Sequence, residues 1–157
     1  MTGPGLYRHF PGKEAVLAEM LVGISERLLA EGSRRVVAAA DPAAALEALL
    51  SWHVSFALSQ PDLITVQTRE LGTVPEPAQR QVRRLQRLYL EEWVTVASEL
   101  SPRTPPARLR TAVHGVFGLL NSTPHSAGQY SASELAPGAR AGLLHSMARA
   151  ALSAASS

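Results

Sequence analysis

Residues 3–14 read Gly-Pro-Gly-Leu-Tyr-Arg-His-Phe-Pro-Gly-Lys-Glu, and this stretch decides how the fold of the whole chain is interpreted. Proline and glycine at positions 11 and 12 are typical of a tight turn between two helices. The pattern therefore predicts a short helix before the turn and a long helix that begins at Lys13. A helix as short as the first one is marginal in water and needs packing partners.

Helical spacing of apolar residues continues from Lys13 to the end of the chain. No segment alternates polar and apolar residues at period two, whereas apolar residues recur at steps of three and four. Prolines stand at several of the expected helix starts. The expected helices span about residues 13–40, 42–59, 61–71, 78–100, 107–121 and 137–152. The sequence thus predicts an all-α fold.

The composition fits one soluble globular domain. Of the 157 residues, 46% are apolar and 18% charged, and no apolar run approaches the roughly 20 residues of a membrane span. Cysteine is absent, which excludes disulfides and thiolate chemistry and is typical of the cytoplasm, the expected location. The net charge of +2 permits contact with nucleic acid without indicating it.

No constellation of catalytic or metal-binding residues is recognisable in the sequence. The five histidines lack the spacing of metal ligands, and no serine has a recognisable base partner. We therefore expect no metal, no cofactor and no enzymatic activity. One alternative is a small helical enzyme that uses His53 or His114 as a base.

The order Tyr-x-His-Phe, turn, Lys-Glu within residues 7–14 closely resembles the recognition-helix end of the helix-turn-helix in TetR-type transcriptional regulators. In helix-turn-helix proteins the start of this helix lies in the major groove, and polar groups fix the register on phosphates. The resemblance implies that Thr2, Tyr7, His9 and Lys13 contact DNA. The alternative is a helical hairpin in which the aromatic side chains merely pack.

In TetR-type proteins two further helices precede this motif, whereas only Met1 and Thr2 precede it in this sequence. We therefore expect residues 1–12 to be the remnant of a DNA-binding head, residues 13–40 a connecting helix, and residues 41–157 the effector-binding and dimerisation domain. A head without its first two helices is expected to bind DNA poorly. A start codon assigned too far downstream would explain this arrangement.

The resemblance also implies a largely apolar cavity for a small effector molecule in the helices after the head. Aromatic side chains with a few polar groups are the usual lining of such a site. The expected pocket residues are Trp52, His53, Phe56, Ile64, Gln67, Thr68, Leu71, Tyr89, Trp93, His114, Phe117 and Asn121. Ordinary core packing is the alternative for each of them. His53, Gln67 and Asn121 stand out, because a polar group on an inward face needs a partner.

The last two long helices of TetR-type proteins pair with a second subunit, so the resemblance implies a homodimer. Residues 113–120 contain no Asp, Glu, Lys or Arg, and their two glycines favour close helix packing. The expected interface residues are Val113, Val116, Leu120, Leu143, Leu144 and Met147. Burial of these side chains within one subunit is the alternative.

Charged side chains offer two further possibilities. Arginines at positions 80, 83, 84 and 87 line one side of the helix expected at 78–100, which is typical of a solvated face or of contact with acidic partners. Arg69 and Glu70 fit either an exposed pair or a group that enters the pocket and binds an anionic effector.

These patterns lead us to expect a ligand-responsive repressor of the TetR type. Its expected partners are operator DNA, provided that a complete head is present, and a small, largely apolar effector. An effector that prefers one arrangement of the two subunits would shift the spacing of the recognition helices and lower operator affinity. The alternative is a stand-alone dimeric module that holds a small molecule and never binds DNA. No membrane contact is expected.

Overall fold

The computed structural model describes residues 12–122 and 135–157. Within these ranges the chain forms six α-helices and one 3₁₀ turn, and no strand. The elements are α2 (Lys13–Ala38), α3 (Pro42–Ser59), α4 (Pro61–Glu70), the turn η1 (Leu71–Thr73), α5 (Glu76–Leu100), α6 (Pro106–Asn121) and α8 (Pro137–Ala154). The expected all-α class is confirmed.

Local sequence explains where the helices begin. The Asp41 carboxylate caps α3 by accepting a hydrogen bond from the N–H of Ala44 at 2.8 Å, and Pro42 opens the first turn. Prolines also stand in the first turns of α4, α5, α6 and α8. The start of α5 differs from the expectation of about residue 78. This helix begins at Glu76, because Pro77 lies in the first turn, where a backbone N–H is not needed.

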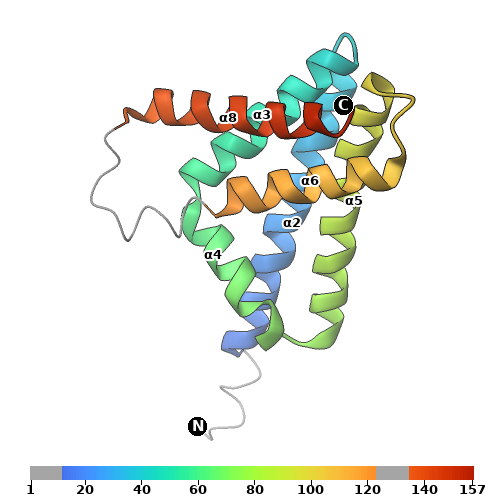
Figure 1. Ribbon diagram of the computed structural model, residues 1–157. Helices are drawn as coiled ribbons and strands as arrows, with labels where there is room; N and C mark the ends of the chain where they lie inside the picture. Colours follow the sequence, from blue (N-terminus) through green and yellow to red (C-terminus); the bar gives the residue numbers. More distant parts are fainter. Residues whose placement is uncertain (1–11, 123–134) are drawn as a thin grey trace, which may run out of the picture.

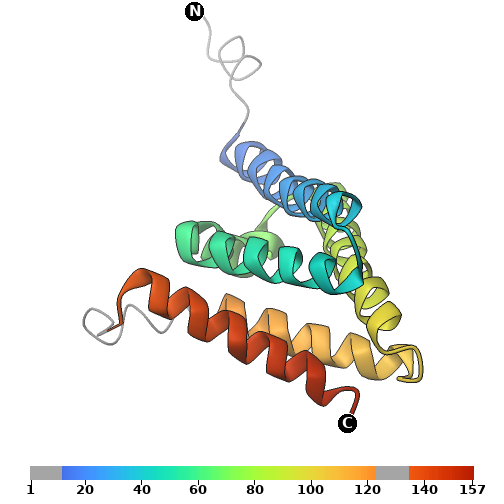
Figure 2. The same cartoon turned by 90° about the horizontal axis from the view of Figure 1, so that it is seen from above.

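The helices form two groups that meet at α3. α2 and α5 run side by side in the same direction, and α3 returns in the opposite direction and leads into α4 (Figure 1). α6 and α8 form an antiparallel pair on the other side of α3 (Figure 2). α3 packs against both groups and therefore occupies the centre of the fold. In the described ranges, no helix is both long and apolar enough to cross a membrane.

Two clusters of buried apolar side chains hold this arrangement. The larger cluster joins α3, α5 and α6 and contains Leu49, Trp93 and Val113, none of which is exposed. The smaller one joins the first half of α2 to the start of α5 through Leu21 and Val82. Each fully buried large apolar side chain contributes roughly 1.5–3 kcal/mol to folding. The larger cluster surrounds the candidate site.

Polar contacts fix the orientation of α8 on α3. A carboxylate oxygen of Glu47 on α3 lies 3.1 Å from Nε2 of His145, and the other lies 3.0 Å from a guanidinium nitrogen of Arg149. These side chains are partly exposed, so each contact contributes at most about 1 kcal/mol. Their main effect is to set the position of α8.

Candidate functional site

A small cavity lies where α2, α3, α4, α5 and α6 meet, and its volume is about 60 Å³. It is lined by Ser25, Leu28, His53, Gln67, Leu85, Gln86, Tyr89, Phe117 and Asn121. His53, Gln67, Tyr89, Phe117 and Asn121 are among the pocket residues expected from the sequence. The structure therefore brings five of the twelve expected side chains together around one space.

His53 is the polar centre of this cavity. Its Nε2 lies 2.9 Å from Oδ1 of Asn121, and its Nδ1 lies 3.3 Å from the hydroxyl of Tyr89. Because an amide oxygen only accepts, Nε2 carries the proton and Nδ1 accepts from the Tyr89 hydroxyl. Only 3% of His53 is exposed. These two hydrogen bonds are what allow a polar ring to be buried here.

Aromatic rings enclose the histidine. The ring of His53 lies nearly parallel to that of Phe117, with centroids 4.9 Å apart, and Tyr89 stacks on Phe117 at 5.5 Å. Trp93 packs edge-on against Phe117 at 5.2 Å. Each such pair contributes about 0.5–1.5 kcal/mol beyond the burial of its surface. The wall of the cavity on the side of α5 and α6 is therefore well ordered.

The cavity is polar but uncharged near neutral pH. Burial lowers the pKa of His53 to about 4, and the hydrogen bond to Asn121 offsets only part of this change. Burial also raises the pKa of Tyr89, while the nearby Trp93 indole and the charge of Arg35 oppose the rise. The Trp93 indole N–H makes no hydrogen bond within the described residues. A ligand in the cavity therefore meets hydrogen-bonding groups and no charge.

A second chain of hydrogen bonds joins α4 to the middle of α2. Nε2 of Gln67 donates to Oγ of Ser25 at 2.9 Å, and this hydroxyl donates to the carbonyl oxygen of Leu21 at 2.9 Å. Ser25 is buried and Gln67 is half-buried. The cavity is thus tied directly to the long helix α2.

The cavity as it stands is too small for an effector. Ligand sites typically measure roughly 300–1,000 Å³, whereas a space of 60 Å³ holds about one or two water molecules. A larger molecule must therefore displace part of the wall.

Seven of the expected pocket residues do not line the cavity: Trp52, Phe56, Ile64, Thr68, Leu71, Trp93 and His114. Trp52 and Phe56 pack between α2 and α3, and the Trp52 indole N–H donates to the carbonyl oxygen of Leu28 at 3.3 Å. Ile64, Trp93 and Leu71 belong to the apolar packing. Thr68 and His114 are exposed.

Sequence reasoning missed four lining residues, which are Ser25, Leu28, Leu85 and Gln86. Leu85 and Gln86 precede Tyr89 by four and three residues, so they lie on the same helix face as an expected pocket residue. That spacing was a usable signal. Ser25 and Leu28 lie on α2, within residues 13–40, for which the sequence predicts a connecting helix.

Gly32 explains how α2 comes so close to the cavity wall. A Cβ atom at this position would lie 2.7 Å from Cε2 of Tyr89 and 3.4 Å from a methyl group of Leu49. Any side chain at this position would require the Tyr89 ring to shift, and glycine avoids that contact.

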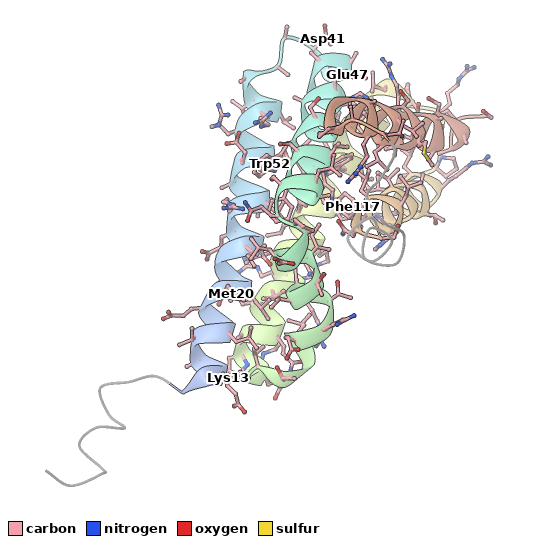
Figure 3. The ribbon with its side chains drawn as sticks, turned by 90° about the vertical axis from the view of Figure 1, so that its left-hand side faces the viewer. Lys13, Met20, Asp41, Glu47, Trp52 and Phe117 are labelled. Atoms are coloured by element: carbon pink, nitrogen blue, oxygen red, sulfur yellow. The ribbon has the colours of Figure 1, made fainter. Side chains whose placement is uncertain are left out.

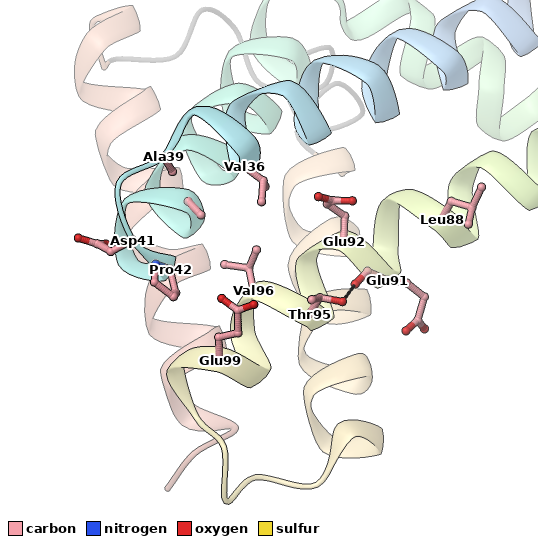
Figure 4. Close-up of a pocket in the computed structure, with 11 residues that line it drawn as sticks. Val36, Ala39, Asp41, Pro42, Leu88, Glu91, Glu92, Thr95, Val96 and Glu99 are labelled. Carbon is pink, nitrogen blue, oxygen red and sulfur yellow. Dashed lines mark hydrogen bonds between the residues drawn. The ribbon is translucent and has the colours of Figure 1, made fainter.

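An acidic hollow of about 440 Å³ lies between the end of α2, the start of α3 and the second half of α5 (Figure 4). Asp41, Glu91, Glu92 and Glu99 are among its lining residues. Glu92 accepts a hydrogen bond from Ser33 at 3.2 Å, and the hydrogen bond from Arg110 lowers the pKa of Glu91. None of the expected site residues lies there. Across the described ranges, no three His, Asp or Glu side chains are placed to hold a metal ion.

Of the expected DNA-contact residues, Thr2, Tyr7 and His9 lie outside the described residues. Lys13 is the first residue of α2 and is exposed at that end of the helix (Figure 3).

The expected interface residues on α6 are buried inside the chain itself. Val113, Val116 and Leu120 have no exposed surface, because they pack into the larger core cluster. Burial within one subunit, the alternative that the sequence left open, therefore describes these three side chains. The outward face of α6 carries Gly115 and Gly118 instead, and both are exposed.

The expected interface residues on α8 are placed differently. Leu143 is 50% exposed and Met147 is 43% exposed, whereas Leu144 is half-buried against the core. α8 therefore presents two large apolar side chains, Leu143 and Met147, on the surface.

No family model matches the chain, and no curated protein matches it. Among solved structures, the chain is similar to the crystal structure of a TetR-family transcriptional regulator from Bordetella parapertussis 12822. The TM-score is 0.76 at 21% sequence identity, and the match covers 94% of this chain and 77% of that one. At this identity the likeness concerns the fold. The chain has the fold of a TetR-family transcriptional regulator, as the resemblance of residues 7–14 predicted.

Proposed function

We propose that this chain is a ligand-responsive transcriptional regulator of the TetR type, acting as a repressor and as a homodimer. The observation that carries the proposal is the polar cavity at His53, enclosed by aromatic rings in the centre of a fold shared with a transcriptional regulator. His53 is hydrogen-bonded to Asn121 and to Tyr89. A ligand that replaces these hydrogen bonds finds donors and acceptors on all three side chains. The proposed effector is small, largely apolar and equipped with few polar groups.

The helix α2 supplies the route from the cavity to DNA. Ser25 and Leu28 line the cavity, and Lys13 begins the same helix, which has 26 residues and is therefore about 39 Å long. A displacement of α2 at Ser25 moves the end that carries Lys13, the described residue that we propose contacts phosphates. An effector that binds one arrangement more tightly lowers operator affinity by the ratio of its two affinities.

The proposed dimer interface consists of the outward faces of α6 and α8. Leu143 and Met147 supply exposed apolar surface, and a Cβ atom at Gly115 or Gly118 would meet nothing within 4 Å. A helix of a second copy can therefore approach α6 closely and cover the apolar residues of α8. This arrangement replaces the three α6 side chains that the sequence had assigned to the interface.

A mobility-shift assay with the DNA upstream of the chain's own gene tests the proposal. The chain and an N-terminally extended form are each measured with and without the ligands that raise the melting temperature in a thermal-shift screen. We expect a shifted band from a protein–DNA complex, and we expect the ligand to dissociate this complex. Ligand binding without a shifted band for either form contradicts it and supports a stand-alone dimeric module that holds a small molecule.

A further inference from the structure

A larger hollow lies directly outside the cavity, on the surface between α5 and α6. Its volume is about 570 Å³, within the roughly 300–1,000 Å³ that is typical of ligand sites. It is lined by Arg83, Gln86, Arg87, Leu90, Glu91, Arg110, His114 and Phe117. We call this hollow the arginine groove.

The arginine groove carries an excess of positive charge. Arg110 is paired with Glu91, with its Nε 2.6 Å and a second nitrogen 3.0 Å from the two carboxylate oxygens. Within residues 12–122 and 135–157, Arg83 donates only to the neutral amide oxygen of Gln79, at 3.2 Å, and Arg87 has no hydrogen bond or ion pair. In this part of the chain, three guanidinium groups of the groove therefore share one carboxylate, and Arg83 and Arg87 have no anionic partner.

The four arginines of α5 divide into two pairs. Arg83 and Arg87 are four residues apart and both line the groove, whereas Arg80 and Arg84 do not. Arg80 is instead paired with Glu76 on its own helix. All four are exposed, as expected for a solvated face, and Arg83 and Arg87 in addition line the groove.

The arginine groove and the cavity share part of their lining. Gln86 and Phe117 line both spaces, and the ring of Phe117 stacks on His53 with centroids 4.9 Å apart. Phe117 is therefore in contact both with the groove and with the hydrogen-bonding group at the centre of the cavity.

We propose that the arginine groove binds the charged head of the effector, which is an oxyanion attached to an apolar body. The guanidinium groups of Arg83 and Arg87 match a carboxylate or phosphate through paired hydrogen bonds. The body lies on Leu90, displaces Phe117 and reaches His53 and Asn121. This inference rests on the proposed function, because it assigns a chemical class to the same effector.

Tryptophan fluorescence measures this binding, with octanoate and octyl phosphate as probes and octanamide as the neutral control. The protein carries Trp52→Phe, so the emission comes from Trp93, which packs edge-on against Phe117. At least one anion is expected to bind, change the emission and lose affinity as salt is added. The tighter of the two identifies the head as carboxylate or phosphate. Octanamide is expected to bind about tenfold more weakly.

Two double variants with the same net charge separate the groove from general electrostatics. Arg83→Gln with Arg87→Gln is expected to weaken anion binding about tenfold, whereas Arg80→Gln with Arg84→Gln changes it by less than about twofold. Equal losses in both variants overturn the inference, as does the absence of any emission change with either anion. If octanamide binds as tightly as the anions, the inference that the effector carries a charged head is also wrong. The mobility-shift assay then still decides the proposed function separately.

Discussion

Replacing Gly32 by alanine tests how tightly α2 packs against the wall of the cavity. The new methyl carbon would lie 2.7 Å from Cε2 and 3.3 Å from Cδ2 of Tyr89. Carbon atoms in favourable contact are about 3.5–4.0 Å apart, so the ring must move by most of an ångström. Tyr89 is only 4% exposed and is stacked on His53 and Phe117, which leaves the ring little space to move.

Two effects of the Gly32→Ala substitution oppose each other. Alanine is favoured over glycine inside a helix by about 1 kcal/mol, whereas overpacking a filled core costs about 1–3 kcal/mol. We expect the free energy of unfolding to fall by about 1 kcal/mol. Gly23→Ala on the same helix is the matched control, because a Cβ atom there meets nothing within 4 Å. This control is expected to raise the free energy of unfolding by about 1 kcal/mol.

Urea unfolding followed by circular dichroism measures both changes. The variants are compared at one protein concentration, because the dimerisation that we propose would make the midpoint depend on concentration. The expectation is wrong if Gly32→Ala raises the free energy of unfolding as much as Gly23→Ala does. In that case the Tyr89 ring has space to move and does not form a fixed wall.

Three further predictions concern pH, assembly and a helix cap. The buried neutral ring of His53 stabilises the fold fully above its unfolded pKa of 6.5, and this contribution, about 3 kcal/mol, is lost as the pH falls towards 4. The free energy of unfolding, measured with urea, should therefore fall more steeply between pH 6.5 and 4 for the wild type than for His53→Gln. If the two proteins lose stability in parallel, His53 is not a buried neutral histidine. Leu143→Glu with Met147→Glu is expected to yield a folded monomer by light scattering, whereas Val37→Glu, at an 85% exposed position, stays dimeric; a dimer in both refutes the proposed interface. Asp41→Ala removes the cap of α3 and should lower the free energy of unfolding by about 1 kcal/mol, and an unchanged urea midpoint would show that the cap is dispensable.

The helices could be predicted from the sequence because apolar spacing and proline positions act locally. The exact start of α5 could not, since Pro77 looks like a helix breaker until its place in the first turn is known. The central histidine was also predictable. A polar side chain on an inward helix face needs partners, and His53 has them in Asn121 and Tyr89.

Other parts of the site depend on how the helices pack, which spacing alone does not determine. Thr68 lies on α4 next to Gln67, yet it faces solvent while Gln67 reaches Ser25. An apolar helix face also does not reveal what covers it. For this reason Val113 looked like an interface residue and is instead part of the core of one chain.

The central claim is that the cavity at His53 binds the effector. The most direct test is calorimetry on the wild type and Asn121→Leu, using every small molecule that stabilises the wild type in a thermal-shift screen. Leucine has a similar size and removes the acceptor of the His53 Nε2–H, and Thr68→Val, on the exposed face of α4, is the control. We expect the affinity to fall about tenfold in Asn121→Leu and to stay unchanged in Thr68→Val. Ligands that bind Asn121→Leu as tightly as the wild type would contradict it.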